Sequence, residues 1–152
     1  SIIIRVSWLY SIFGKNFMET IINISKAKKS INVINDQIGS PTSANDLVDC
    51  IFKIIDSEKF NYYAQEKSIF NFCNSGSCSW YEFAEEILLL TNSDCKVCPI
   101  RTDEYKTLAA RPKYSVLNTS KIESSFGLEI NSWQEALQNT INSVNTNYNK
   151  SI

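Results

Sequence analysis

The sequence predicts an α/β fold in which short strands alternate with helices. Three runs of apolar, often β-branched residues are each followed by a polar turn and then by a stretch whose apolar residues recur every three or four positions. The length of 152 residues suits one domain with a real core, and a composition of 43% hydrophobic and 20% charged residues is ordinary for a globular protein. In such folds the turns that follow strands are the usual ligand-binding positions.

These patterns place the expected elements in order. Strands are predicted where the apolar runs lie, over residues 2–8, 31–34, 69–73 and 95–100. Helices are predicted from apolar spacing and from caps, over residues 15–29, 43–56, 79–90, 118–127 and 131–144. Residues 57–67 and 101–110 are expected to be connections, and residues 114–117 an extended piece after a proline. The first strand is expected to be buried because its side chains are almost all apolar.

Two helix starts carry recognisable caps. Ser79 and Glu82 form the S-x-x-E pattern of a full capping box, and Ser43 with Asp46 forms a weaker version of it. The helix after Ser43 is expected to bury one stripe of apolar side chains, which consists of Ala44, Leu47, Val48, Ile51 and Ile55.

The turn 35–42, Asn-Asp-Gln-Ile-Gly-Ser-Pro-Thr, is the strongest candidate for a ligand-binding loop. It follows the strand 31–34, contains a glycine, a proline and side chains that can hydrogen-bond, and leads into a helix. Gln37 and Thr42 flank it. Capping and turn hydrogen bonds are the alternative interpretation of both side chains.

The composition argues against several classes of function. A net charge of −1 gives no electrostatic case for nucleic acid or an anionic membrane, and no apolar run is long enough to span a bilayer. The chain has no histidine, the commonest general base, and its four glycines lie too far apart for a dinucleotide-binding loop. Tyr63 and Lys67 match the Tyr-x-x-x-Lys spacing of short-chain dehydrogenases, but they lie in a polar connection, where a chance match is expected. The sequence therefore predicts no catalytic residue and no metal site.

Five cysteines, an odd number without a secretory signal, indicate free thiols in a reducing compartment. Most of them are expected to be small buried side chains. Cys95 and Cys98 form a C-x-x-C pair, which leaves a zinc site open as the alternative, although histidines or a second matching pair would be needed to complete it.

The sequence offers more candidate ligand-binding side chains than candidate catalytic side chains. Arg111 precedes a proline in a loop, where its guanidinium could grip phosphate or form a surface salt bridge. Trp8, Tyr10 and Asn16 surround the first strand-to-helix loop. Aromatic faces and an amide at that place could hold a base or a sugar, and ordinary packing is the alternative.

Several stretches, taken in order, resemble one family of enzymes. The stretches are residues 5–10 (RVSWLY), 14–17 (GKNF), 33–42 (VINDQIGSPT), 46–47, 70–76, 79–84, 111–115 and 117–119. Together they resemble the C-terminal half of the dTDP-4-dehydrorhamnose reductase family, which are RmlD-like extended short-chain dehydrogenases/reductases, over nearly the whole chain. The resemblance implies a substrate-binding domain over residues 1–148 and a frayed tail at 149–152. It also implies an N-terminal Rossmann domain, absent from this chain, that carries the catalytic Tyr-x-x-x-Lys pair.

The resemblance further implies an activity and a set of binding residues. The family transfers hydride from NADPH or NADH to the C4 ketone of dTDP-4-dehydrorhamnose and forms dTDP-rhamnose. The cofactor would be bound mainly by the missing domain, so this chain alone is expected to be inactive. Ser7 and Trp8 would lie beside the nicotinamide and the sugar. The residues implied to bind the substrate are Trp8, Asn16, Gln37, Gly39, Pro41, Thr42 and Arg111.

The partners implied are the dTDP-sugar, the N-terminal Rossmann half of the same chain and a second copy in a homodimer, all in the cytoplasm. Residues 2–6 are expected to belong to the interface with the other half. An alternative is a non-catalytic partner subunit of the same fold, similar to the regulatory β subunit of methionine adenosyltransferase. A thiol-based metal module is a third hypothesis.

Overall fold

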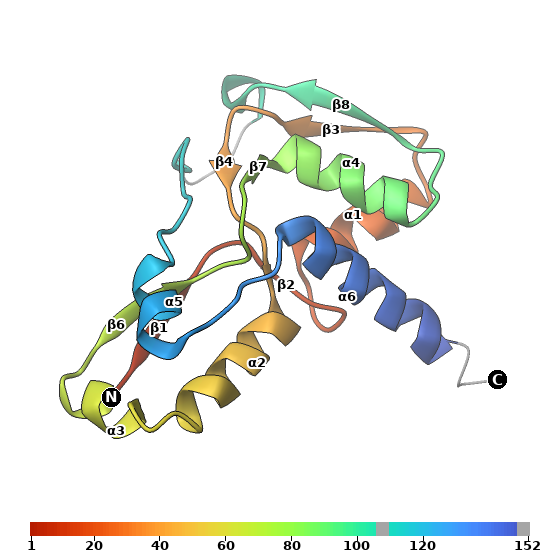
Figure 1. Cartoon of the computed structure of the whole chain (residues 1–152). Coiled ribbons are helices and arrows are strands. Elements are labelled where there is room, and N and C mark those ends of the chain that lie inside the picture. The colour runs from red at the N-terminus through yellow and green to blue at the C-terminus, as the bar shows by residue number, and fades with distance from the viewer. Residues whose placement is uncertain (106–109, 149–152) are drawn as a thin grey trace.

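The computed structural model describes residues 1–105 and 110–148, apart from the side chains of residues 144–148 (Figure 1). Its strands are β1 (Ile3–Val6), β2 (Leu9–Tyr10), β3 (Ser30–Ile34), β4 (Ile38–Gly39), β5 (Thr42–Ser43), β6 (Ile69–Phe72), β7 (Cys78–Ser79) and β8 (Lys96–Ile100). Its helices are α1 (Phe17–Ser25), α2 (Ala44–Ile55), α3 (Phe60–Gln65), α4 (Trp80–Leu90), the 3-10 helix η1 (Thr102–Glu104), α5 (Ser120–Phe126) and α6 (Trp133–Tyr148). The predicted α/β alternation is confirmed, and the expected frayed tail at 149–152 lies outside the described residues.

In the described part of the chain the strands form separate pairs. β1 pairs in parallel with β6, and β3 pairs in parallel with β8. Two-residue pairs join β2 to β5 in parallel and β4 to β7 antiparallel. Because β4 and β5 lie in and just after the turn 35–42, these short pairs attach the turn to both ends of the molecule.

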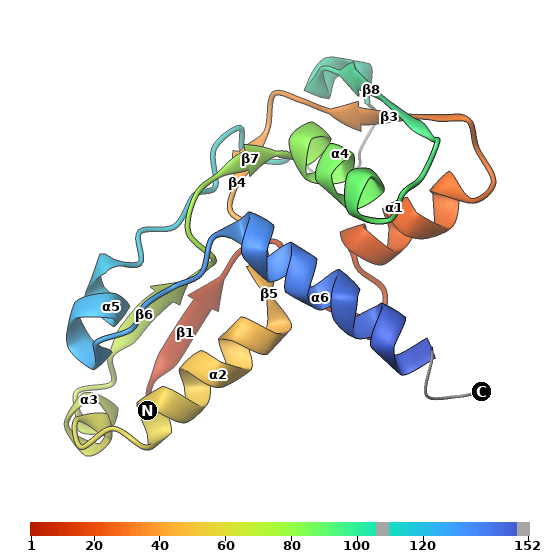
Figure 2. The same cartoon turned by 45° about the vertical axis from the view of Figure 1, so that its right-hand side comes forward.

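Apolar side chains gather in two cores. The α4 core lies among α1, α4, α6 and β3 and is centred on Phe83, Ile87 and Leu137, which are fully buried. The β6 core lies among α2, α5 and β6 and consists of Cys50, Ile54, Phe70, Phe72, Ile122 and Leu128. Figures 1 and 2 show β3, β8, α1 and α4 at one end of the molecule, and β1, β6, α2, α3 and α5 at the other.

The buried side chain of Asn74 joins these two ends. Its amide oxygen accepts a hydrogen bond from the backbone N–H of Ser43 at 2.8 Å. Its amide nitrogen donates to Asp46 of α2 and, at 3.3 Å, to the backbone carbonyl of Asn131 ahead of α6. One fully buried amide therefore holds α2, the end of β6 and the start of α6 together.

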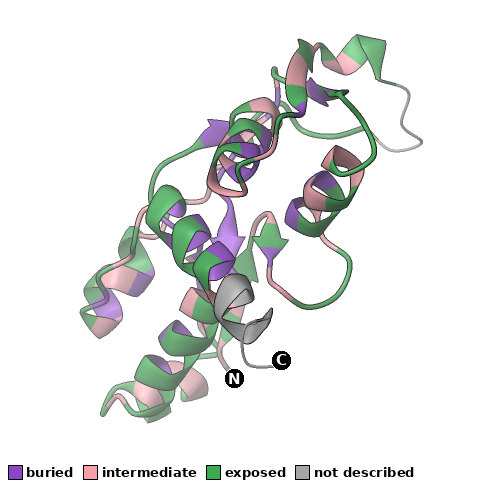
Figure 3. Ribbon diagram, turned by 90° about the vertical axis from the view of Figure 1, so that its right-hand side faces the viewer, coloured by how far each residue is buried: buried purple, intermediate pink, exposed green. Residues whose placement is uncertain are grey.

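The predicted burial was wrong for the first strand and for one helix. β1 is largely exposed, with Ile3 at 51%, because only the face that carries Ile4 packs against the β6 core and the opposite face is uncovered in the described chain. On α2 the buried residues are Cys50 and Ile54, whereas Val48, Ile51 and Ile55 of the predicted stripe are exposed. This helix has two adjacent apolar stripes, and periodicity alone does not tell which one faces the core (Figure 3).

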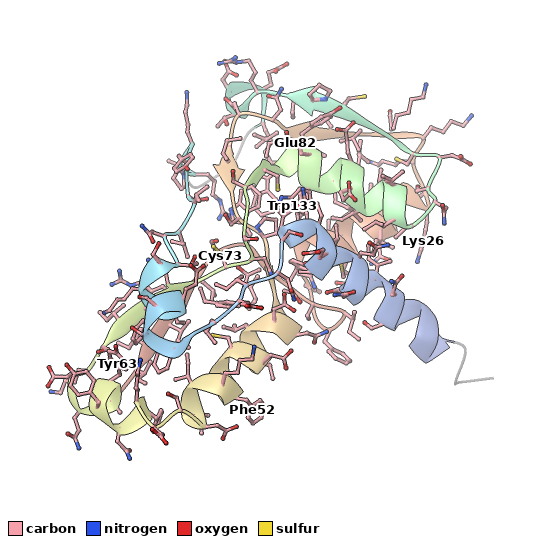
Figure 4. All side chains as sticks on the ribbon, viewed as in Figure 1. Lys26, Phe52, Tyr63, Cys73, Glu82 and Trp133 are labelled. Atoms are coloured by element: carbon pink, nitrogen blue, oxygen red, sulfur yellow. The ribbon has the colours of Figure 1, made fainter. Side chains whose placement is uncertain are left out.

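Other corrections concern one additional helix and the two ends of predicted helices. The expected connection 57–67 contains α3, whose Tyr63 packs against Phe70 and Phe126 at centroid distances of 5.3 and 5.2 Å (Figure 4). Lys67, the other residue of the Tyr-x-x-x-Lys match, lies beyond the end of this helix. Tyr63 itself is a packing residue of the β6 core. Ser79 and Glu82 form the predicted capping box, but Ser43 makes no side-chain cap. The last helix, predicted over residues 131–144, extends from Trp133 to Tyr148.

Candidate functional site

A cavity of about 600 Å³ opens beside the α4 core, between α1, β3, the start of α4 and the segment after η1. Its floor is apolar and is formed by Ile21 and Ile24 of α1 together with Ile31 and Val33 of β3. Its polar rim includes Gln37 of the turn 35–42 and Arg111. The cavity therefore lies at the end of a strand, where the sequence predicted a ligand.

Two tryptophans form one wall of this cavity. The rings of Trp8 and Trp80 are stacked, with centroids 3.5 Å apart and an interplanar angle of 9°. Phe17 packs against Trp80 with a centroid distance of 4.5 Å. Gly39 lies against the Trp8 ring so closely that a Cβ there would be 2.6 Å from Cζ2 of the indole. The wall is thus built from Trp8, which directly precedes β2, and from α1, α4 and the turn 35–42.

The backbone around Trp8 is fixed by hydrogen bonds to the turn. The Ser7 hydroxyl donates to the carbonyl of Ser40 at 2.8 Å, and the buried Thr42 hydroxyl donates to the carbonyl of Ser7 at 2.5 Å. The N–H of Thr42 donates to the carbonyl of Trp8 at 3.1 Å. Ser7 and Thr42 therefore position the Trp8 wall through the backbone.

The turn 35–42 also holds both ends of the segment that follows β8. The Gln37 amide donates to the Thr102 hydroxyl at 3.1 Å, and Thr102 donates to Asp36 from its hydroxyl at 2.6 Å and from its backbone N–H at 2.9 Å. The hydrogen bond from the Thr102 hydroxyl is the main cause that lowers the pKa of Asp36 below its ordinary value. Further along, Ile38 exchanges backbone hydrogen bonds of 2.8 Å with residues 113 and 115.

The cavity is rich in donors and has no acidic lining. Among its lining residues in the described chain there is no aspartate or glutamate, and Arg111 forms no ion pair with a described residue. The indole N–H groups of Trp8 and Trp80 are not seen to donate a hydrogen bond to a described residue either. Such a surface favours a ligand that carries negative charge and many oxygen acceptors.

The implied binding residues divide into three groups. Trp8, Gln37 and Arg111 line the cavity. Ser7, Gly39, Pro41 and Thr42 lie behind the wall, where they support Trp8 and the turn. Asn16 caps α1: its amide donates to the carbonyl of Ser11 at 2.8 Å and accepts from the N–H of Glu19 at 3.1 Å. Asn16 is not among the residues that line the cavity, so its implied contact with the substrate stays a prediction.

Sequence reasoning missed several lining residues. Phe17 and Trp80 were assigned only to helices, and Asn32, Tyr105 and Ser115 were not singled out. Trp80 could have been singled out from the sequence because it directly follows the Ser79 cap. The first position of a capped helix is fixed in space. Asn32 could be found only by knowing which face of β3 meets the cavity.

The cysteines take no part in this site. All five are free thiols, and all except Cys98 are buried, which confirms the expectation that most are small core side chains. Burial raises the pKa of Cys50 to about 11 and that of Cys78 to about 12. These two thiols are therefore protonated at neutral pH and are poor nucleophiles and metal ligands.

Comparison with known proteins identifies the family. The family model for the RmlD substrate binding domain matches residues 1–146. The chain belongs to this family. Within the described residues, no helix has the length and apolar character needed to cross a membrane.

The chain is similar to the spore coat polysaccharide biosynthesis protein SpsK of Bacillus subtilis, with 38% identity over 138 residues that cover 91% of this chain and 46% of that protein. It is also similar to two solved structures of dTDP-4-dehydrorhamnose reductase. That of Clostridium acetobutylicum is 39% identical, with a TM-score of 0.84 over 95% of this chain and 49% of that one. That of Bacillus anthracis, a complex with NADP, is 37% identical, with a TM-score of 0.83 over 93% and 48%. The chain thus spans about half the length of these relatives.

Proposed function

We propose that this chain is the substrate-binding half of an NADPH- or NADH-dependent dTDP-4-dehydrorhamnose reductase of the cytoplasm. The complete enzyme would reduce the C4 ketone of dTDP-4-dehydrorhamnose to give dTDP-rhamnose. The observation that carries the proposal is the donor-rich cavity without acidic lining, in a chain of this family. A dTDP-sugar combines a doubly charged diphosphate with the hydroxyls of a sugar, which is the chemistry that such a cavity recognises.

The residues have distinct roles in this proposal. Arg111 would bind the diphosphate, because a guanidinium offers paired donors to phosphate oxygens. Gln37 and the Trp8 wall would bound the sugar and keep water from the reacting carbon. The bound nicotinamide would supply the hydride, and Trp8 and Ser7 would lie beside it. This chain fits a sugar nucleotide better than a dinucleotide, because its glycines lie in separate turns.

The described lining of the cavity offers one phenol, Tyr105, and no lysine, histidine or carboxyl group to pair with it for the proton that must reach the C4 oxygen. The chain has no histidine, and Tyr63 is packed into the β6 core, away from the cavity lining. The proton donor would therefore belong to the other half of the enzyme, as the Tyr-x-x-x-Lys resemblance implies. The gene sequence upstream of Ser1 tests this directly: a Tyr-x-x-x-Lys pair supports the enzyme, and its absence favours a non-catalytic partner subunit. The comparisons favour the reductase.

The role of Arg111 can be measured in the complete reductase. Arg111→Ala should weaken binding of the dTDP-sugar by about 1–3 kcal/mol, the usual loss for a hydrogen bond to a charged group. Arg101→Ala is the matched control, because Arg101 is exposed, pairs with Asp103 and does not line the cavity. A KM for the dTDP-sugar that is unchanged by Arg111→Ala would remove this residue from the site.

The same proposal provides a partner for the end of the molecule that contains β1 and α2, where apolar side chains are exposed. The free edge of β1 and the exposed side chains Ile3, Val48, Phe52 and Ile55 would be covered by the N-terminal half (Figure 4). Parallel sheets are normally buried on both faces, and two strands alone make a marginal sheet. The isolated chain should therefore self-associate, and Phe52→Lys should shift it toward monomer in a sedimentation experiment. A wild-type chain that is already a compact monomer, with no change on addition of the N-terminal half, would contradict this interface.

A further inference from the structure

Trp8 has a backbone conformation that needs support. Its φ angle is +45°, in the left-handed region that a bulky side chain rarely adopts. Such a conformation is strained and persists only where its surroundings over-determine it. The hydrogen bonds of Ser7 and Thr42 fix the backbone around Trp8, and the contacts of its side chain add to this support.

Both faces of the Trp8 indole are covered. Trp80 lies parallel to one face at 3.5 Å. A Cβ on Gly39 would lie 2.6 Å from Cζ2 and 2.7 Å from Nε1 of Trp8, and nearer still to Cε2, which lies between them. A point closest to Cε2 lies above the ring rather than beside its edge. Since Trp80 fills one face, Gly39 fills the other, and only the edge of the indole is left for a ligand.

This sandwich is anchored in the α4 core. Trp80 is the first residue of α4, directly after the Ser79 capping box, so its backbone is fixed. Phe17 packs against Trp80 at 4.5 Å and against Phe83 at 5.7 Å. Phe83 is fully buried. A continuous series of aromatic contacts therefore links the cavity wall to the centre of the molecule.

We infer that Trp80 and Gly39 are positioning residues that clamp Trp8, so that the edge of its indole meets the oxygens of the nucleotide-sugar. The inference rests on the proposed function and adds which atoms of the ligand the Trp8 side chain selects. The edge of an aromatic ring is positive, and the indole N–H is a donor. A clamped Trp8 therefore selects hydroxyl or phosphate oxygens and leaves no free face on which a base could stack.

The clamp can be tested in the 152-residue chain without any ligand. Two stacked indoles whose in-plane transition moments are rotated against each other couple their strong far-ultraviolet transitions and give a paired positive and negative band in the far-ultraviolet circular dichroism spectrum. Trp80→Phe and Trp8→Phe should each abolish this signal, because each removes one indole. Trp133→Phe should retain it, because Trp133 packs against Phe83 at 5.9 Å. A signal that survives Trp80→Phe would overturn the clamp.

The consequence for binding is tested in the complete reductase. Trp80→Ala should raise KM for the dTDP-sugar about 3- to 10-fold, the range expected for loss of one aromatic pair, with a smaller change in kcat. Trp80→Phe should recover most of the affinity, because a ring still covers Trp8. Gly39→Ala should raise KM as well, because its Cβ has no space. Leu89→Ala, an exposed position on the same helix, should leave KM unchanged.

The outcomes separate the clamp from the proposed function. If the wild-type reductase binds dTDP and Arg111→Ala weakens it, but Trp80→Ala and Gly39→Ala do not change KM, then only the clamp is overturned. If the wild-type enzyme does not bind a dTDP-sugar at all, the proposed function fails and the inference fails with it. Raised KM in both Trp80→Ala and Gly39→Ala, with recovery in Trp80→Phe, supports the clamp.

Discussion

The two ends of this molecule are built from the same alternation of strands and helices, but only one of them is closed. Around the α4 core, residues from α1, α4, α6 and β3 bury one another, and Phe83, Ala84 and Ile87 are fully buried. At the β6 core, β1 contributes no fully buried residue and has an open edge. An α/β pattern in sequence therefore indicates the elements without indicating which faces of their strands are buried.

Because the two ends of the molecule differ in burial, they suit two different roles. The closed end holds the cavity, and its wall is fixed by packing and by the hydrogen bonds of Ser7 and Thr42 before any ligand arrives. The open end presents apolar surface that is costly in water, which suits a surface that is covered in a longer protein. The proposed binding site and the proposed docking surface would thus lie at opposite ends of the molecule, with the buried side chain of Asn74 between them.

The largest effect expected comes from the buried stripe of α2. Ile54 is only 2% exposed, so Ile54→Ala should lower the free energy of unfolding by about 2–5 kcal/mol through lost burial and a cavity. Phe52 on the adjacent stripe is 60% exposed, so Phe52→Ala should cost the monomeric chain, at concentrations below those at which it self-associates, less than about 1 kcal/mol. Urea unfolding of both variants measures the difference. Equal losses would mean that the Phe52 stripe is covered in the isolated chain.

A smaller loss is expected at the joint between the two ends. Asn74→Ala should cost about 1–3 kcal/mol, because the buried N–H of Ser43 would lose its acceptor and Asp46 the amide that donates to it. If the joint couples the two cores, their unfolding should also become less cooperative. Tryptophan fluorescence reports on the α4 core and far-ultraviolet circular dichroism on both ends. Coincident transitions in Asn74→Ala, at wild-type stability, would show that Asn74 does not couple the two ends.

Sequence reasoning succeeded where the signal was local and failed where it depended on neighbours. The Ser79 capping box and the strand-to-turn character of 35–42 follow from residue order, and both were predicted. The buried stripe of α2 was predicted wrongly, because Cys50 and Ile54 compete with Ile51 and Ile55 at equally good helical spacing. The stacking of Trp8 on Trp80 joins residues 72 positions apart, and no spacing rule predicts such a contact.

The smallest effect expected is a pH dependence at the segment after β8. The folded state holds the pKa of Asp36 below its ordinary value of 3.8, mainly through the hydrogen bond from the Thr102 hydroxyl. A lowered pKa means that the contribution of Asp36 to stability is present above pH 3.8 and is lost as the pH falls through the folded-state value. Asp36→Asn can accept the same hydrogen bonds without a charge, so it should remove this part of the acid sensitivity.

The measurement is the urea midpoint of the wild-type chain and of Asp36→Asn at pH 7 and near pH 3. Glu135 also has a lowered pKa, because Ser132 donates to it, but its contribution is the same in both chains and cancels in the comparison. The effect should shrink in high salt, because Asp36 is accessible to solvent and its interactions are screened. If the two chains lose stability in parallel between pH 7 and pH 3, Asp36 does not stabilise the segment that borders the cavity, and the turn 35–42 holds that segment through the Gln37–Thr102 hydrogen bond and the backbone bonds of Ile38.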